Sequence, residues 1–181
     1  MKDLASHILD ILQNSVTAGS NLIEVSIDEL PVADKYVLRI VDDGKGMDAE
    51  MIKQVTDPFF TTRTTRKVGL GLPLLKQNVE RTGGSFAIRS QPGRGTEVVA
   101  EFGYNHIDRL PLGDIAGTLA LTASSYPGID FIYTHTTPEG TFVFDTTIIK
   151  EKLESIPIND VEVINFMKDL IRDNIAAIKA S

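Results

Sequence analysis

Polar side chains able to do chemistry gather on one side of a helix near the start of the chain. They follow one another at steps of three, four and three residues and are His7, Asp10, Asn14 and Thr17. Residues three or four apart are neighbours on a helix surface. The Asn14 amide oxygen could coordinate magnesium, and the Asp10 carboxylate could activate an attacking water. A solvated helix face would explain the same stripe equally well.

The segment Val41–Met47 combines acidic residues with glycines. Gly44 and Gly46 permit tight backbone turns and the close approach of a ligand. The ionised Asp42 carboxylate only accepts hydrogen bonds, so it can receive the exocyclic amino group of adenine. The alternatives are an acidic calcium-binding loop and an ordinary turn. Calcium fits poorly, because the segment lacks oxygen ligands at alternating positions and a distal Glu.

The segment Gly69–Leu72 could bind phosphate, because it directly precedes a helix expected to begin near Pro73. Its free backbone N–H groups would face the ligand at the positive end of that helix. The loop before it holds the densest basic cluster of the chain, which consists of Arg63, Arg66 and Lys67. Such cations pair with phosphate oxygens, and a solvated loop is an equal alternative. The phosphate-loop ATPase motif and the dinucleotide-binding glycine motif are both absent from the sequence.

A hydroxyl group stands at the beginning of a predicted strand, in the sequence Gly93-Arg94-Gly95-Thr96. Thr96 shares the apolar side of that strand with Val98, because side chains two apart point the same way. Its hydroxyl could bond adenine, or it could merely satisfy the turn.

Periodic apolar residues predict the elements that position these side chains. Residues 3–17 form an amphipathic helix, and residues 22–28 and 36–42 form strands with an alternating pattern. Asp42 lies on the apolar side of its strand, where an acid needs a partner. The elements that follow are a short helix, a loop, a helix and two strands, at 49–55, 57–68, 73–81, 85–90 and 96–102.

The pattern changes near residues 105–111, and we expect a domain boundary there. Residues 1–108 would form the main domain, and residues 109–181 an extension made of a helix, a β-hairpin and helices. In this extension Asn159 or Asp160 could cap the final helix. The extension could serve as a partner-binding or homodimer surface.

The acidic composition limits the possible partners. With a net charge of −7, the chain has no broad basic surface for a nucleic-acid backbone. It lacks cysteine, and its three histidines lack metal-ligand spacing, so a metal ion is expected to arrive with a nucleotide. No apolar run is long enough to span a bilayer, and no signal core begins the chain. We therefore expect a cytoplasmic protein that binds neither nucleic acid nor membrane.

Five segments resemble, in order and spacing, the sequence boxes of the GHKL superfamily of gyrase, heat-shock chaperone, histidine kinase and mismatch-repair ATPases. They cover roughly residues 4–103 and lie at 10–20, 42–47, 57–62, 68–72 and 93–96. The box Asp57–Thr62 is most similar to that of sensor histidine kinases. The resemblance implies the Bergerat ATP-binding fold, an α+β two-layer sandwich in which helices cover a mixed sheet. An α/β extension would follow it here.

The resemblance also implies residue roles in binding ATP or ADP with magnesium. Asn14 would coordinate magnesium, Asp42 would bind the adenine amino group with Thr96 nearby, and Met47 would line the base. Residues 61–68 would form the ATP lid. The full set of nucleotide-binding residues that it implies is Asn14, Asp42, Gly44, Gly46, Met47, Thr61, Thr62, Arg63, Lys67, Gly69, Leu70, Gly71, Leu72 and Thr96.

The chain departs from the family pattern at three positions. Asp10, the candidate catalytic base, stands where members that hydrolyse ATP or phosphorylate serine carry Glu. Thr17 replaces a Lys of many histidine kinases, and Lys67 stands where the second glycine box often opens with Gly. His7 lies two helical turns before Asn14, so we expect it at the helix surface or pocket rim rather than as a phosphoacceptor.

Three functions fit these features. The chain could be a stand-alone kinase that phosphorylates a separate protein, as anti-sigma serine kinases of the superfamily do, because no phosphoacceptor helix pair precedes the first box. It could be an ATPase-type switch in which closure over ATP alters a partner surface. We expect a regulatory kinase or ATPase that binds ATP with magnesium and acts on a separate protein. The alternative is a nucleotide-sensing switch or adaptor without chemistry.

Overall fold

Residues 2–59 and 71–179 are described by the structure, a computed structural model of the chain. In chain order, the elements are α1 (Leu4–Thr17), β1 (Leu22–Leu30), η1 (Pro31–Ala33), β2 (Lys35–Asp42), α2 (Ala49–Thr56), α3 (Gly71–Arg81), β3 (Ser85–Ser90), β4 (Thr96–Gly103), α4 (Ile115–Ser125), β5 (Asp130–Thr137), β6 (Gly140–Asp145), α5 (Thr146–Leu153) and α6 (Val161–Lys179).

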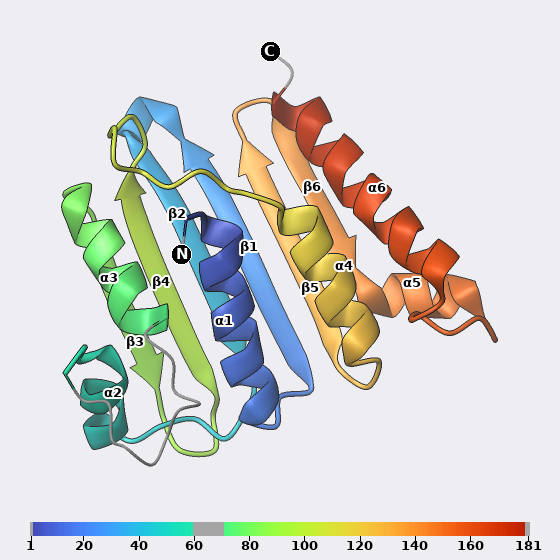
Figure 1. The fold of residues 1–181 in the computed structure, drawn as a ribbon, viewed down its shortest axis with the longest axis horizontal. Helices are drawn as coiled ribbons and strands as arrows, with labels where there is room; N and C mark the ends of the chain where they lie inside the picture. The colour runs from blue at the N-terminus through green and yellow to red at the C-terminus, as the bar shows by residue number, and fades with distance from the viewer. Residues whose placement is uncertain (1, 60–70, 180–181) are drawn as a thin grey trace.

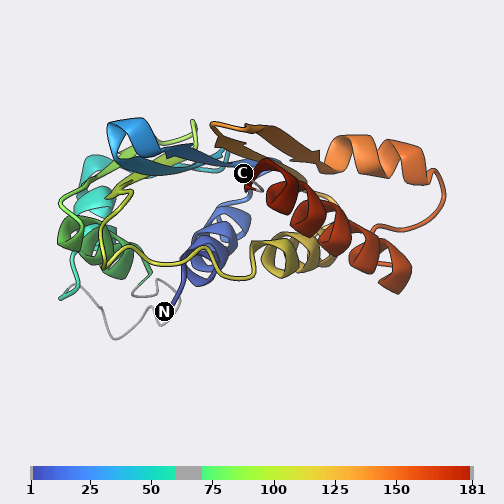
Figure 2. The ribbon, with the colours of Figure 1, turned by 90° about the horizontal axis from the view of Figure 1, so that it is seen from above.

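The strands form one mixed sheet in the order β3-β4-β2-β1-β5-β6 (Figure 1). Neighbouring strands are antiparallel except for β1 and β5, which are parallel. Figure 2 shows α1, α3, α4 and α6 on one face of this sheet. The two-layer α+β sandwich predicted from the sequence is therefore confirmed. Within the described ranges, no helix has both the length and the apolar character that a bilayer crossing requires.

Helix α1 lies near the middle of the helical layer, and its buried side chains pack against the sheet (Figure 1). It begins where Asp3 caps it, with Asp3 Oδ1 accepting a hydrogen bond from the Ser6 amide at 2.8 Å. Its apolar stripe, which includes Leu4, Ile8 and Leu12, is fully buried against the sheet. The helical spacing of these residues in the sequence thus determines which side of α1 remains for polar groups.

Alternation along the strands brings polar residues together at one end of the inner sheet face. Every second residue of β2, from Tyr36 to Asp42, is buried. The register places Asp42 between Ile23 of β1 and Thr96 of β4, and places Thr96 opposite Ser90 of β3. Asp42 and Thr96 therefore meet beneath the last turn of α1, at the end of the apolar core.

The C-terminal residues continue the same sheet across the boundary predicted near residue 108. Strand β5 pairs with β1, and β6 pairs with β5 as the predicted hairpin. Buried side chains of β5, α4 and α6 join those of α1 and β1 in one apolar cluster. Of the two predicted caps, Asp160 is the one used, because its Oδ1 accepts from the Glu162 amide at 2.9 Å.

A buried polar cluster ties the end of β1 to the extension. His135 of β5 is fully buried, and its Nε2 lies 2.8 Å from Glu29 Oε1, while its Nδ1 lies 2.7 Å from the Tyr133 hydroxyl. Lys179 Nζ lies 3.1 Å from the same Glu29 oxygen. Burial alone would raise the pKa of Glu29, but the hydrogen bonds from His135 and Lys179 lower it to about 2. Because an ionised carboxylate only accepts, the His135 proton facing Glu29 lies on Nε2.

We expect Glu29→Gln to lower the free energy of unfolding at pH 7 by about 2–4 kcal/mol, because it removes the charge that His135 and Lys179 surround. The pKa of Glu29 is lower in the folded chain than its ordinary value of 4.5. Its stabilising contribution is therefore complete above about pH 4.5 and is lost as the pH falls toward 2. Urea titrations between pH 7 and pH 3 should show the difference from wild type shrinking.

The exposed substitution Glu80→Gln on α3 is the matched control and should have little effect at any pH. A difference between wild type and Glu29→Gln that stays constant over this pH range would contradict the assignment.

Candidate functional site

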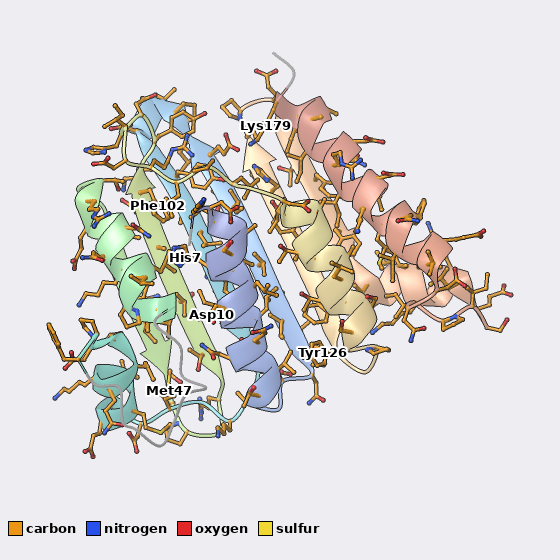
Figure 3. The ribbon with its side chains drawn as sticks, viewed as in Figure 1. His7, Asp10, Met47, Phe102, Tyr126 and Lys179 are labelled. Atoms are coloured by element: carbon orange, nitrogen blue, oxygen red, sulfur yellow. The ribbon has the colours of Figure 1, made fainter. Side chains whose placement is uncertain are left out.

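A cavity of about 200 Å³ opens between the last turns of α1, the ends of β2 and β4, and helix α2. Figure 3 shows Met47 at this end of the molecule, with Asp10 on α1 above it. Six of the predicted nucleotide-binding residues line the cavity and are Asn14, Asp42, Gly46, Met47, Leu72 and Thr96. The predicted residues Gly44 and Gly71 lie beside the cavity rather than in its wall.

The Asp42 carboxylate is held in a fixed orientation by two donors. Its Oδ2 accepts a hydrogen bond from the Ser15 hydroxyl of α1 at 2.6 Å, and its Oδ1 accepts from the Gly44 amide at 3.0 Å. Ser15 is thus the partner that the sequence required for an acid on the apolar side of a strand. Each carboxylate oxygen keeps a further lone pair, so Asp42 can accept another hydrogen bond from a ligand in the cavity.

Ser90 is a positioning residue that the sequence analysis did not single out. Its hydroxyl oxygen accepts from the Met47 amide at 2.7 Å and donates its proton to the Gly95 carbonyl at 2.8 Å. The Thr96 hydroxyl lies 2.9 Å away. Because Ser90 has one proton and gives it to Gly95, Thr96 donates in this pair and presents its lone pairs to the cavity. Finding Ser90 required the register of β3 on β4.

Gly46 allows the loop after β2 to approach the turn between β3 and β4. Its φ of +69° lies in the left-handed region, and a Cβ there would overlap the Gln91 carbonyl oxygen. Gly44 also packs closely, because a Cβ there would lie 2.8 Å from that of Ala18 at the end of α1. Both glycines therefore act by letting the backbone fit, and Gly44 also supplies an N–H group to Asp42.

The cavity walls are largely apolar and contain residues absent from the predicted set. These are Ile11, Ser15 and Thr17 of α1, its C-cap Ala18, Ile40 of β2, Lys45, Met51 and Val55 around α2, and Val98 of β4. Ile40 shares the inner sheet face with Asp42, and Val98 shares it with Thr96, because side chains two apart on a strand point the same way. Strand periodicity could therefore have identified both residues. Such walls suit a flat, apolar ring whose edge carries hydrogen-bonding groups.

Asp10 lies against the first residue of α3 and outside the cavity wall. A Cβ on Gly71 would overlap the Asp10 carboxylate, so only glycine allows this contact. Asp10 Oδ2 is buried and has no hydrogen-bond partner among the described residues. Burial raises the pKa of Asp10, which makes its carboxylate a stronger base.

The expectation that His7 lies at the helix surface or pocket rim is wrong. His7 is fully buried, because α3 covers this side of α1, and its Nε2 accepts from the Asn78 side-chain amide at 3.1 Å. Burial lowers the pKa of His7, an effect that the nearby Gly71 backbone partly offsets. His7 therefore packs between α1 and α3 and lies outside the cavity wall.

Part of the predicted site lies outside the described residues. These positions are Thr61, Thr62, Arg63, Lys67, Gly69 and Leu70, which include the predicted lid.

The chain resembles bacterial sensor kinases over about half its length. It is 31% identical over 88 residues to sporulation kinase C of Bacillus subtilis, covering 49% of this chain and 20% of the kinase. It is 38% identical over 69 residues to sensor kinase CckA of Brucella abortus, covering 38% of this chain and 7% of that protein. The chain thus spans a fifth or less of these two relatives.

A solved structure shares the fold over a longer stretch. The ATPase domain of Aquifex aeolicus MutL, complexed with ADP, covers 85% of this chain and 68% of that one at a TM-score of 0.53 and 14% identity. That likeness concerns the fold alone. Residues 2–106, more than half of the chain, match the family described as histidine kinase-, DNA gyrase B- and HSP90-like ATPase. The chain therefore belongs to this ATPase family.

Proposed function

We propose that the chain binds ATP with magnesium and acts as a regulatory kinase or ATPase on a separate protein. The observation that carries this proposal is the Asp42 carboxylate, held by Ser15 and Gly44 at the edge of an apolar cavity. A fixed acceptor at the rim of a flat apolar slot recognises a ring with an exocyclic amino group, as adenine has. Membership of an ATPase family supports the same ligand.

The shape of the cavity favours binding of the base within it and of the phosphates beyond it. At about 200 Å³, it is smaller than the roughly 300–1,000 Å³ of pockets that enclose whole ligands. Ile40, Val98 and Met47 would contact the faces of the ring, and Thr96 would accept at its edge. The phosphates would then extend toward α1 and the beginning of α3, where the positive end of a helix favours anions.

Asn14 suits a magnesium ion that arrives with the nucleotide. Within residues 2–59 and 71–179, no group of three or more His, Cys, Asp or Glu could hold a metal ion. Asn14 lines the cavity, and its side chain carries one amide oxygen that could serve as a ligand. This fits magnesium, which binds through one or two protein ligands and completes its octahedron with phosphate oxygens and water. The ion would supply charge neutralisation at the phosphates.

Asp10 is the residue on which chemistry would depend. Its unpartnered, buried oxygen lies at the beginning of α3, on the side toward which the phosphates would extend. There it could accept a proton from an attacking water or hydroxyl group. The relatives named as kinases support transfer to a protein acceptor. Family resemblance leads us to expect Glu at this position, and the side chain of Asp10 is shorter. A switch or adaptor without turnover is therefore the alternative.

We expect Asp42→Asn to weaken ATP binding about tenfold or more. The amide lacks the negative charge of the carboxylate, and its NH2 group would point at one of the two donors that now bond to Asp42. Isothermal titration calorimetry with ATP measures this directly. Asp28→Asn is the matched control, because Asp28 lies on the outer face of β1 and should leave affinity unchanged. Equal affinities of wild type and Asp42→Asn would rule out the adenine contact.

We expect Asn14→Ala to reduce the gain in ATP affinity that magnesium confers, while affinity without magnesium stays near that of wild type. The reason is that the substitution removes the proposed metal ligand and leaves the base-binding contacts intact. Titrations with and without magnesium on the same variant provide the internal control. If both affinities fell equally, Asn14 would be a contact to the nucleotide rather than to the metal.

We expect Asp10→Asn to lower phosphate release, or transfer to an added protein, by about a hundredfold or more with ATP affinity unchanged. Labelled ATP incubated with a cell lysate reports transfer, and phosphate release reports hydrolysis. Turnover that survives the substitution would exclude Asp10 as the base. A wild-type chain that binds ATP and shows neither activity would favour the adaptor alternative.

A further inference from the structure

A second cavity, of about 570 Å³, lies at the opposite end of the sheet from the nucleotide cavity. Figure 3 shows Lys179 near this end and Met47 near the other. Charged and aromatic side chains from β1, β2, the segment after β4 and the end of α6 line it, among them Glu29, Tyr36, Tyr104, Arg109 and Lys179. Its volume is that of cavities that enclose small organic ligands.

Arg109 is held beside this cavity with donors to spare. Its guanidinium carbon lies 4.6 Å from the centre of the Tyr36 ring and 5.0 Å from that of Tyr104, and its Nε donates to the Tyr104 carbonyl at 2.6 Å. None of the ion pairs among the described residues includes Arg109. The terminal N–H groups of Arg109 are thus held in a fixed orientation and pair with no carboxylate of the described residues. The chain as a whole carries a net charge of −7.

Two acids, Glu29 and Glu139, line the cavity. Glu29 does not neutralise Arg109, because its oxygens already accept from other residues. Glu29 Oε1 is shared by His135 and Lys179, and Glu29 Oε2 accepts from the Tyr104 hydroxyl at 3.3 Å. Lys179 keeps further N–H donors toward the cavity, because an ammonium group has three. The cavity therefore holds two cations beside two acids, and the terminal N–H groups of Arg109 remain available to an anion.

Tyr36 adds a polar group without a partner. Its side chain is 1% exposed, and its hydroxyl forms no hydrogen bond among the described residues. A buried hydroxyl in that state is unfavourable relative to a hydrogen-bonded one. The Arg109 guanidinium covers the Tyr36 ring, so a ligand bound by Arg109 would lie next to Tyr36.

We propose that this cavity binds a small organic monocarboxylate. Its carboxylate pairs in the plane of the Arg109 guanidinium through two parallel hydrogen bonds, and a second polar atom of the ligand meets the Tyr36 hydroxyl. A doubly charged phosphate fits less well, because Glu29 and Glu139 also line the cavity and would repel the second charge.

This site is separate from the proposed nucleotide site. Tyr36 and Asp42 lie six residues apart on β2, about 20 Å along the strand. Leu38 and Ile40 between them are buried in the core. A nucleotide in the first cavity therefore does not reach Arg109, and the second cavity requires its own ligand.

The test uses the full chain and a panel of defined probes, namely acetate, lactate, mandelate, 4-hydroxyphenylacetate and inorganic phosphate. Ligand-observed NMR and thermal unfolding detect weak binding. We expect at least one of the three hydroxy acids to bind one-to-one and more tightly than acetate or phosphate. Arg109→Gln should weaken that probe at least tenfold, whereas Arg39→Gln, which alters an arginine on the outer sheet face, should not.

Tyr36→Phe provides a second variant in case Arg109→Gln fails to fold. Because the hydroxyl has no partner, this variant should unfold without probe at the wild-type temperature or above it, and should bind the hydroxy acid at least threefold more weakly. The proposal is overturned if no carboxylate binds, if phosphate binds as tightly, or if neither variant changes binding. A loss in Arg109→Gln alone supports the carboxylate contact and overturns the hydroxyl contact.

Discussion

The hydrogen bond between Ser15 and Asp42 is the contact on which the candidate site depends. It joins α1 to the end of β2 at 2.6 Å, beyond the last apolar residue of the inner sheet face. A carboxylate at that depth is unfavourable unless donors surround it, so α1 must present a hydroxyl there and the loop after β2 must turn an amide back toward it. These two requirements place Asn14 and Thr17 above the same cavity. The geometry of the site therefore follows from satisfying one buried acid.

Close backbone contacts complete the site around that acid. Gly46, Ser90 and Thr96 bring the loop after β2 and the turn between β3 and β4 together, and Gly71 lets the beginning of α3 meet Asp10. The end of the cavity beside Asp42 and Thr96 is thus built by paired strands, whereas Leu72 brings α3 to its wall.

Local sequence patterns were sufficient for the main elements and for six of the residues that line the cavity. The apolar spacing of α1 and the alternation in β2 predicted the orientation of Asn14 and Asp42, because each depends only on residues a few positions away. Contacts between distant residues could not be predicted in this way. The burial of His7 depends on Asn78, the role of Ser90 depends on strand register, and Glu29 meets His135 across the parallel pairing of β1 with β5. No short-range pattern encodes these pairings.

A crystal structure of the chain with magnesium and a non-hydrolysable ATP analogue would decide whether Asp42 recognises adenine and Asn14 holds the metal ion. We expect the adenine amino group within hydrogen-bonding distance of an Asp42 oxygen, the ring between Met47 and Val98, and magnesium on the Asn14 amide oxygen. A nucleotide bound elsewhere, or one whose amino group faces away from Asp42, would contradict it.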